Sequence, residues 1–364
     1  MLLRILPFVC LWIFLNACAG ELSAQNSPQK RQFQQWDRNR DGILTKQEVP
    51  EGPRRNFENV DKNGDGKITL QEHLSATSSS KKSTRKSAGR GFTRHLIRQT
   101  WPQEPNGFDR EYFVSLPTQA QKSWPVTFVF HGNGGQAESG LRNWPKRLPG
   151  HLVVAAQGYE KSWNISDERS RAPDIDFFRE LVADLKKKYP KVDLSQISIM
   201  GFSNGAGMVY RILIEADEST PIRNAIPMVS SMVTEQFHDN HFWKRTNDST
   251  NTYDQKIDPQ GKTNIMTIHG TNDKVVPYQG GKRGRTAVHL SAQDTAFAWA
   301  RHQGFEGRKI PDKDGKPWKP EIIEYDYPQA NVTHLKVVGA GHGFGKHSKT
   351  INDRVVNFIQ SNLK

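Results

Sequence analysis

Short apolar runs, each followed by a turn that contains glycine or polar residues, mark the chain from residue 126 onward. Continuous apolar runs with such boundaries are typical of strands that are buried on both faces of a parallel sheet. Helical periodicity follows two of them, at 206–215 and 291–301. The alternation predicts an α/β domain, with a mostly parallel sheet and helices on both faces. The runs in question are 126–130, 151–155, 197–200, 225–229, 265–268 and 335–338.

A different pattern fills the first quarter of the chain, where the twelve-residue segments 37–48 and 61–72 carry polar residues at alternate positions. Oxygen-bearing residues stand at positions one, three, five, nine and twelve, with glycine at six and a backbone carbonyl ligand at seven, which is the pattern of an EF-hand calcium loop. Two tandem matches disfavour a merely acidic linker, so we predict two bound Ca²⁺ ions. The predicted ligands are Asp37, Asn39, Asp41, Ile43, Thr45 and Glu48, and Asp61, Asn63, Asp65, Lys67, Thr69 and Glu72.

The segment between the two loops contains Pro50, Gly52 and Pro53, which predict a very short exit helix for the first hand. Leu44 and Ile68 occupy position eight of their loops, where apolar contact would pair them. We expect a small α-helical EF-hand pair whose calcium stabilises structure, since extracellular calcium is abundant and a sensor is then disfavoured.

The pentapeptide Gly201-Phe202-Ser203-Asn204-Gly205 joins the apolar run 197–200 to the helical pattern 206–215. A serine in a tight turn between strand and helix is exposed above the sheet as a nucleophile, with glycines where the backbone must pass closely. An ordinary glycine-rich turn is the alternative for this pentapeptide taken alone.

Three further segments favour the nucleophile. Asp273 follows run 265–268 and His342 follows run 335–338, so the chain order is Ser, Asp, His, as in the α/β-hydrolase triad. We predict Ser203 as nucleophile, His342 as general base and Asp273 as the acid that orients it. The backbone N–H groups of Asn204 and of the turn at Asn133 are the predicted oxyanion hole. No cofactor is expected for catalysis.

Residues 110–364 resemble the secreted polyhydroxybutyrate depolymerase and feruloyl esterase-like α/β hydrolases. Besides the pentapeptide, the resemblance rests on Asp174-Ile-Asp176-Phe177, on the run from His269 to Tyr278, and on the helix 291–301. It implies an α/β-hydrolase fold, an esterase activity and the same three catalytic residues. The chain departs from many members at Asn133, where they have cysteine, and at Gly343-Phe344, where they have Trp-Pro.

Four parts are expected along the 364 residues: a signal peptide at 1–24, the EF-hand pair at 29–74, a flexible basic linker at 75–91 and the catalytic domain at 92–364. Residues 15–18 also resemble a lipobox, which would end the signal at 17 and lipidate Cys18; ordinary cleavage near Ala19 or Ala24 is the alternative. We therefore expect an exported protein, extracellular, periplasmic or anchored at the cell surface through that lipid.

The net charge is +13, with 51 Lys and Arg against 38 Asp and Glu, and it persists despite the acidic loops. A basic surface favours polyanions, but no nucleic-acid reading motif accompanies it, so nucleic acid is not an expected partner. The cysteines are Cys10 and Cys18, so no disulfide is expected in a mature chain that begins after Ala19 or Ala24. We expect a monomer.

The expected substrate is an ester, polymeric or polysaccharide-linked, such as polyhydroxybutyrate or the feruloyl and acetyl esters of polysaccharides. Two alternatives stay open: a non-catalytic calcium-dependent surface binding protein and a serine peptidase of the same fold. The polar insertion 234–262 is interpreted either as an aromatic lid or cradle or as a packed surface excursion. Its aromatic residues are Phe237, Phe242, Trp243 and Tyr253, and Trp163 is a similar candidate.

Overall fold

The computed structural model describes residues 28–54, 57–78, 91–215, 220–250, 252–282 and 287–363. The chain divides into two compact units, with the boundary between Lys86 and Ser87. The predicted signal segment 1–24, with Cys18, and residues 79–90 of the predicted linker lie outside the described residues. Within the described ranges, no helix is both long and apolar enough to cross a membrane.

The smaller unit is a pair of helix–loop–helix hands around its own core. Its elements are α2 Pro28–Trp36, β1 Ile43–Thr45, α3 Glu51–Arg54, α4 Phe57–Val60, β2 Lys67–Thr69 and α5 Leu70–Ser78. The apolar residues that pack together in it are Phe33, Leu44, Val49, Phe57 and Ile68. The imidazole ring of His73 contacts the rings of Phe33 and Trp36, with centroids 5.6 and 5.8 Å apart.

The two loops pair through the antiparallel strands β1 and β2, in a register that places Leu44 opposite Ile68. This is the apolar pairing that the sequence predicts, and both side chains are buried. The exit helix α3 has four residues, in agreement with the two prolines near it. One boundary differs: α5 extends to Ser78, so residues 75–78 continue the helix where the sequence was interpreted as linker. Leu74 and Ala76 are residue types with high intrinsic helix propensity, which favours continuation of the helix beyond residue 74.

The larger unit contains a ten-stranded sheet in the order β15-β16-β17-β12-β8-β7-β5-β6-β4-β3. The run from β17 to β6 is parallel, and antiparallel strands complete both edges. The strands are β3 Thr93–Trp101, β4 Glu104–Ser115, β5 Trp124–Phe130, β6 Leu152–Ala156, β7 Val192–Phe202, β8 Ile222–Met228, β12 Asn264–Gly270, β15 Lys316–Lys319, β16 Ile322–Tyr327 and β17 Val332–Val337.

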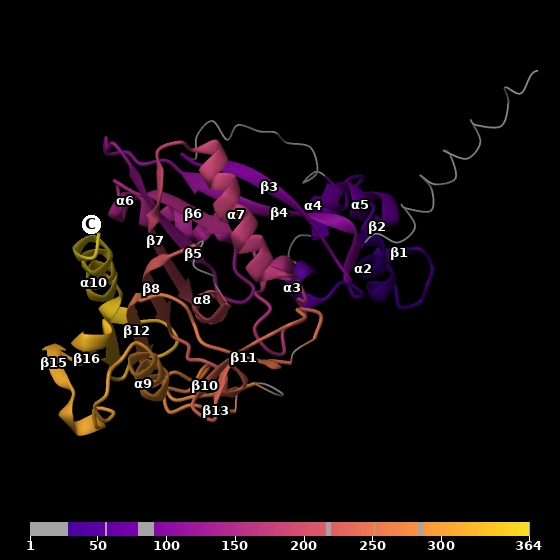
Figure 1. The fold of residues 1–364 in the computed structure, drawn as a ribbon. Coiled ribbons are helices and arrows are strands. Elements are labelled where there is room, and N and C mark those ends of the chain that lie inside the picture. Colours follow the sequence, from indigo (N-terminus) through magenta and orange to yellow (C-terminus); the bar gives the residue numbers. More distant parts are fainter. Residues whose placement is uncertain are drawn as a thin grey trace, which may run out of the picture. The chain divides into compact units, whose positions relative to one another are not determined.

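Helices cover both faces of this sheet, and alternate residues of each strand supply the two cores. In β6, for example, Leu152 and Val154 belong to one core while Val153 and Ala155 belong to the other. The first core includes side chains of α7, α8 and α9, and the second includes those of α10. Figure 1 shows the ribbons of these helices and of the sheet. The helices of this unit are α6 Trp144–Arg147, α7 Asp174–Lys188, α8 Asn204–Glu215, α9 Ala292–His302 and α10 Ser348–Ser361. A parallel sheet covered on both faces explains the continuous apolar runs, and it is the α/β-hydrolase architecture that the sequence predicts.

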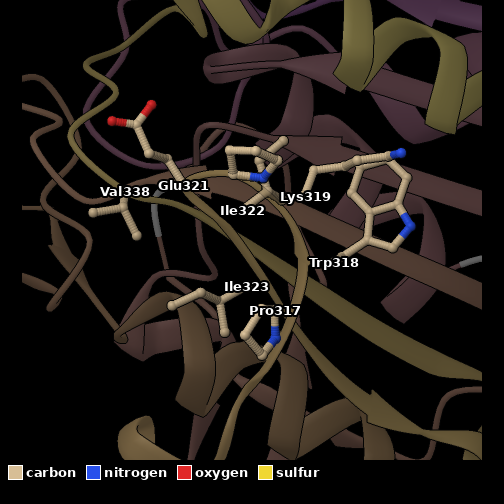
Figure 2. Close-up of a pocket in the computed structure, with 8 residues that line it drawn as sticks. Pro317, Trp318, Lys319, Glu321, Ile322, Ile323 and Val338 are labelled. Carbon is tan, nitrogen blue, oxygen red and sulfur yellow. The ribbon is translucent and has the colours of Figure 1, made fainter.

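The larger unit also contains two small sheets of short strands. The insertion forms a three-stranded sheet of β9 Phe237–His238, β10 His241–Lys244 and β11 Gln255–Ile257, and β13 Gly281–Lys282 pairs with β14 Val288–His289. At the edge of the main sheet, the β15–β16 hairpin borders a hollow of about 390 Å³. Trp318 and Val338 lie on opposite sides of this hollow (Figure 2). None of Ser203, Asp273 and His342 lines it.

Candidate active site

Ser203 occupies a strained turn at the end of a central strand. Strand β7 ends at Phe202 and α8 begins at Asn204, so Ser203 is the connection between them. Its φ is +57°, a left-handed conformation that a non-glycine residue adopts at a cost of about 1–2 kcal/mol. The Ser203 N–H donates to the Met228 carbonyl at 2.9 Å, which ties the turn to the end of the neighbouring strand β8. Such strain is typical of functional turns.

Close backbone contacts explain the two glycines that flank the serine. A Cβ at residue 201 would lie 2.0 Å from the Gly205 carbonyl oxygen, and one at residue 205 would lie 2.2 Å from the Phe130 carbonyl oxygen. Both contacts are with backbone, which cannot move aside as a flexible side chain can. Glycine is therefore required at both positions for the turn to pack against β5.

The structure brings the three predicted catalytic side chains together from the ends of three strands. Ser203 Oγ lies 2.8 Å from His342 Nε2, and His342 Nδ1 lies 2.8 Å from Asp273 Oδ2. Ser203 and Asp273 are buried, while His342 is partly exposed. A serine hydroxyl hydrogen-bonded to an imidazole that a carboxylate orients is the arrangement that nucleophilic catalysis requires.

Four hydrogen bonds reach the Asp273 carboxylate, all from donors. Oδ2 accepts from His342 and from His269, and Oδ1 accepts from the N–H groups of Val275 and Val276 at 2.8 and 3.0 Å. Burial opposes ionisation, but these hydrogen bonds outweigh it and hold the pKa of Asp273 well below its usual range. The resulting stabilisation of the fold is present above the usual aspartate range and is lost as the pH falls through the lowered pKa.

His269 is a contact of the acid that the sequence analysis did not single out. Its Nε2 lies 3.2 Å from Asp273 Oδ2 and 3.0 Å from the Val276 carbonyl oxygen. Both partners only accept hydrogen bonds, so Nε2 carries the proton. The ring is buried and its Nδ1 has no partner among the described residues. Its place directly before Gly270, four residues ahead of Asp273, was the available signal.

We expect His269→Leu to lower kcat by about tenfold with little change in KM, because Asp273 then orients His342 less firmly. Without that donor the pKa of Asp273 rises, since fewer hydrogen bonds oppose burial. His269→Gln keeps an N–H donor and should restore most of the rate. Steady-state kinetics of both variants test this; equal losses of kcat in His269→Leu and His269→Gln would contradict it.

The residues between His269 and Asp273 hold the loop that carries His342. A Cβ at residue 270 would lie 2.3 Å from the Ala340 carbonyl oxygen, so glycine allows the two loops to touch. The Asn272 N–H donates to that same carbonyl at 2.9 Å, and Thr271 Oγ1 accepts from the Gly339 N–H at 2.8 Å. The run therefore fixes both the acid and the base of the site.

The predicted oxyanion donors lie beside the nucleophile. A Cβ at residue 132 would be 3.4 Å from Ser203 Cβ, which places the turn at Asn133 next to Ser203, and Asn204 is the first residue of α8. Within the part of the chain that the structure describes, the N–H groups of Asn133 and Asn204 donate to no other group. His131 shapes the turn: its Nδ1 lies 2.7 Å from the Gly132 carbonyl oxygen, and its Nε2 accepts from the Gly158 N–H at 3.0 Å. Burial lowers the pKa of His131, in keeping with a neutral ring.

The Asn204 side chain has a separate task. Its Oδ1 accepts from the Trp163 N–H at 2.7 Å, and its Nδ2 donates to the Trp163 carbonyl at 3.0 Å and to Glu168 Oε1 at 2.8 Å. Glu168 Oε2 in turn accepts from the N–H groups of Ile165 and Ser166. The residue after the nucleophile therefore anchors the 162–168 loop, and Glu168 is a second contact that no sequence motif indicated.

Most of the aromatic residues considered for a substrate cradle are packed into the protein. Trp163 is 0% exposed and donates Nε1–H to the His131 carbonyl at 2.9 Å. Phe242 packs against Trp299 with ring centroids 4.5 Å apart, and the buried Tyr253 donates its hydroxyl to the Ile165 carbonyl. For these three residues the lid or cradle interpretation is wrong, because burial leaves no face for a ligand. Trp243 is half-buried and stacks on His238.

The EF-hand loops hold their oxygen ligands in tight turns. Asp37 Oδ2 accepts from the Gly42 N–H, and Asp61 Oδ2 accepts from the Gly66 N–H. Asp37 Oδ1 is buried and has no hydrogen-bond partner among the described residues, which fits a place for a cation. Hydrogen bonds from Thr45 lower the pKa of Glu48, and those from Thr69 lower the pKa of Glu72.

The described residues contain no group of three or more His, Cys, Asp and Glu side chains arranged so that it could hold a metal ion. The two glutamates at position twelve bond Thr45 and Thr69 instead. EF-hand ligands also include Asn and Thr oxygens and a backbone carbonyl, so the donor set still fits Ca²⁺.

Comparisons with known proteins point the same way. A family model described as serine hydrolase (FSH1) matches residues 147–304, and an EF-hand family model matches residues 30–49 and 56–72. Among curated proteins, none matches the sequence.

Several solved structures match the chain at low identity. A protein described as a dipeptidyl aminopeptidase IV from Bacteroides ovatus is 14% identical, with a TM-score of 0.48 over 76% of this chain and 37% of its own length. An acetyl xylan esterase from Aspergillus awamori is 14% identical, with a TM-score of 0.47 over 73% and 99%. A ferulic acid esterase from Anaeromyces mucronatus is 17% identical, with a TM-score of 0.40 over 77% and 93%.

This chain spans little more than a third of the length of the Bacteroides ovatus protein. The fold is established by the topology of the sheet, and around Ser203 a serine, a histidine and an aspartate form one hydrogen-bonded line. The larger unit has the α/β-hydrolase fold. The serine hydrolase model matches residues 147–304 of it, and the EF-hand model matches two segments of the smaller unit.

Proposed function

We propose that the protein is a serine hydrolase of carboxylic esters. The observation that carries the proposal is the continuous hydrogen-bonded line Ser203–His342–Asp273, with 2.8 Å at each step, at the carboxyl end of the parallel strands. The left-handed turn holds the serine hydroxyl in place before substrate binds. Preorganisation of this kind lowers the barrier, since no rearrangement is needed during attack.

In the acylation step, Ser203 Oγ attacks the ester carbonyl carbon while His342 Nε2 takes its proton. Asp273, which is ionised, stabilises the imidazolium through Nδ1. The carbonyl oxygen becomes an oxyanion that accepts hydrogen bonds from the Asn204 and Asn133 N–H groups. Collapse of the tetrahedral intermediate breaks the carbon–oxygen bond, and His342 returns the proton to the leaving alcohol. Water then attacks the acyl-serine by the same sequence and releases the acid.

The substrate class that we propose is an ester that is polymeric or linked to a polysaccharide. The resemblance of residues 110–364 to depolymerases and feruloyl esterases supports it. A panel of p-nitrophenyl acyl esters, methyl ferulate, acetylated xylan and polyhydroxybutyrate film, with a dipeptide amide for comparison, tests it. Turnover of the amide with none of the esters would contradict an esterase and favour the peptidase alternative.

We further propose that the EF-hand unit binds two Ca²⁺ ions, through the twelve ligands predicted from the sequence. The buried, unpartnered Asp37 Oδ1 and the paired loops support this proposal. When bound, calcium supplies charge neutralisation among the loop carboxylates. No catalytic step involves it.

Calorimetry should show about two Ca²⁺ bound per chain, and Glu48→Gln and Glu72→Gln should each remove one, because each loses the ligand at position twelve. Glu58→Gln is the matched control: Glu58 is exposed, lies outside both loops and pairs with Lys46. The wild type binding no calcium, or the control losing as much binding as the loop variants, would contradict the assignment.

Export is proposed from the apolar segment 1–24, with lipidation of Cys18 as its membrane link, and both lie outside the described residues. Mass spectrometry of the mature N-terminus tests this. A diacylated Cys18 would establish the anchor, an unmodified N-terminus near residue 20 or 25 would establish simple secretion, and an intact Met1 would contradict export.

A further inference from the structure

A pocket of about 290 Å³ lies next to the catalytic residues, on the side of the sheet that carries α6 and α10. Phe202, which precedes Ser203, lines it, and so do Gly343 and Phe344, which follow His342. We call it the side pocket. A Cβ at Gly343 would meet nothing within 4 Å, so the space beside His342 is open at this point.

The interior of the side pocket is apolar. Its buried lining side chains include Val129, Met200, Met228 and Phe344. The polar residues Asn143, Ser348 and Asn352 also line it, but they are exposed or half-buried, which places them toward the solvent side. The cation of Arg147 is paired with Asp353 at 3.0 Å. Binding in this pocket is favoured for an apolar group, because the group buries apolar surface and the buried part of the lining carries no charge.

The size of the side pocket limits its guest. An apolar cavity of about 150 Å³ accommodates benzene. The side pocket, at about 290 Å³, has room for one six-membered ring with short substituents. It lies at the small end of the range of about 300–1,000 Å³ for ligand sites, so it suits one group of a substrate and not a whole polymer segment.

The position of His342 indicates whether the side pocket binds the acyl portion or the alcohol portion of the ester. His342 gives its proton to the leaving oxygen, so the alcohol portion must lie on its side of the reacting carbon. The Phe202 ring, which lines the pocket, lies 5.6 Å from the His342 ring and 6.5 Å from the ring of Phe344, another lining residue. The oxyanion residues Asn133 and Asn204 do not line it.

We infer that the side pocket binds the leaving alcohol of the ester and favours alcohols that carry one apolar ring. This inference rests on the proposed esterase function and narrows its substrate class, because a polysaccharide-linked ester releases a polar sugar alcohol that an apolar pocket disfavours. Phe202 and Phe344 are then specificity-determining residues, since their rings border the alcohol.

The test compares Asn352→Phe, which fills the mouth of the side pocket, with Asn357→Phe on the same helix. Asn357 is exposed and does not line the pocket, so the pair separates filling from a general effect on α10. The substrates are benzyl acetate, ethyl acetate, and ethyl phenylacetate, which carries the ring on its acyl side. Asn352→Phe should lower kcat/KM for benzyl acetate by about tenfold or more, mostly through KM. Ethyl acetate and ethyl phenylacetate should change less than about twofold, and Asn357→Phe should match the wild type.

A second variant works in the opposite direction. Trp144→Ala enlarges the side pocket and should raise the rate for naphthylmethyl acetate relative to benzyl acetate. If neither variant changes these ratios, or if ethyl phenylacetate is the ester that Asn352→Phe impairs, the assignment is overturned. A larger effect on an acetylated methyl glucoside than on benzyl acetate would overturn the preference for an apolar ring. Lack of ester turnover by the wild type is a different result, which would overturn the proposed function itself.

Discussion

Ser203→Ala should leave a folded protein whose ester hydrolysis is lower by at least about a thousandfold. The substitution removes the nucleophilic oxygen, and no other described hydroxyl lies within hydrogen-bond distance of His342 Nε2. It also removes one hydrogen bond, which contributes about 1 kcal/mol, so the thermal midpoint should shift by only a few degrees. Initial rates with p-nitrophenyl acetate, together with thermal unfolding, measure both effects.

Ser195→Ala provides the matched control for this variant. Ser195 lies on the same strand β7 but is exposed, and its hydroxyl bonds the nearby Asp193. The control should hydrolyse esters at the wild-type rate. Wild-type turnover by Ser203→Ala, or labelling of that variant by a fluorophosphonate at the wild-type level, would show that another residue is the nucleophile.

Asp273→Asn should lower kcat by about a hundredfold to ten-thousandfold, less than the loss in Ser203→Ala, because the acid orients and does not react. All four hydrogen-bonding partners of the carboxylate are donors. An asparagine must therefore turn its amide NH₂ either toward His269 and His342 or toward the two backbone N–H groups. Either orientation leaves buried donors without an acceptor, at a cost of about 1–3 kcal/mol, so stability should fall along with the rate.

Kinetics and denaturant unfolding of Asp273→Asn check both parts of this expectation. Asp294 is another carboxylate of the larger unit; it accepts a hydrogen bond from Ser291 and pairs with Lys309, so it is committed elsewhere. Asp294→Asn is therefore the control, with an expected rate within about twofold of wild type. A neutral Asp273→Asn combined with an inactive Asp294→Asn would reverse the two roles.

The sequence by itself determined the features that a contiguous motif encodes. The elbow around Ser203, the acid at Asp273, the base at His342 and the two twelve-residue loops each combine side-chain chemistry with the turn that presents it, so each could be identified locally. Buried parallel strands also have a local pattern, because both of their faces are apolar, and this predicted the α/β class. The paired loop residues Leu44 and Ile68 followed from equivalent positions in two repeats.

Other features arise only when distant segments pack, and the tertiary structure decided them. Glu168, for example, accepts a hydrogen bond from Asn204 across 36 positions of sequence. Trp163 and Phe242 are chemically suited to a substrate cradle, yet packing buries them. The side pocket is assembled from strand ends, α6 and α10. An aromatic residue has the same local pattern whether it binds a ligand or fills a core, because burial depends on neighbours that the local sequence does not contain.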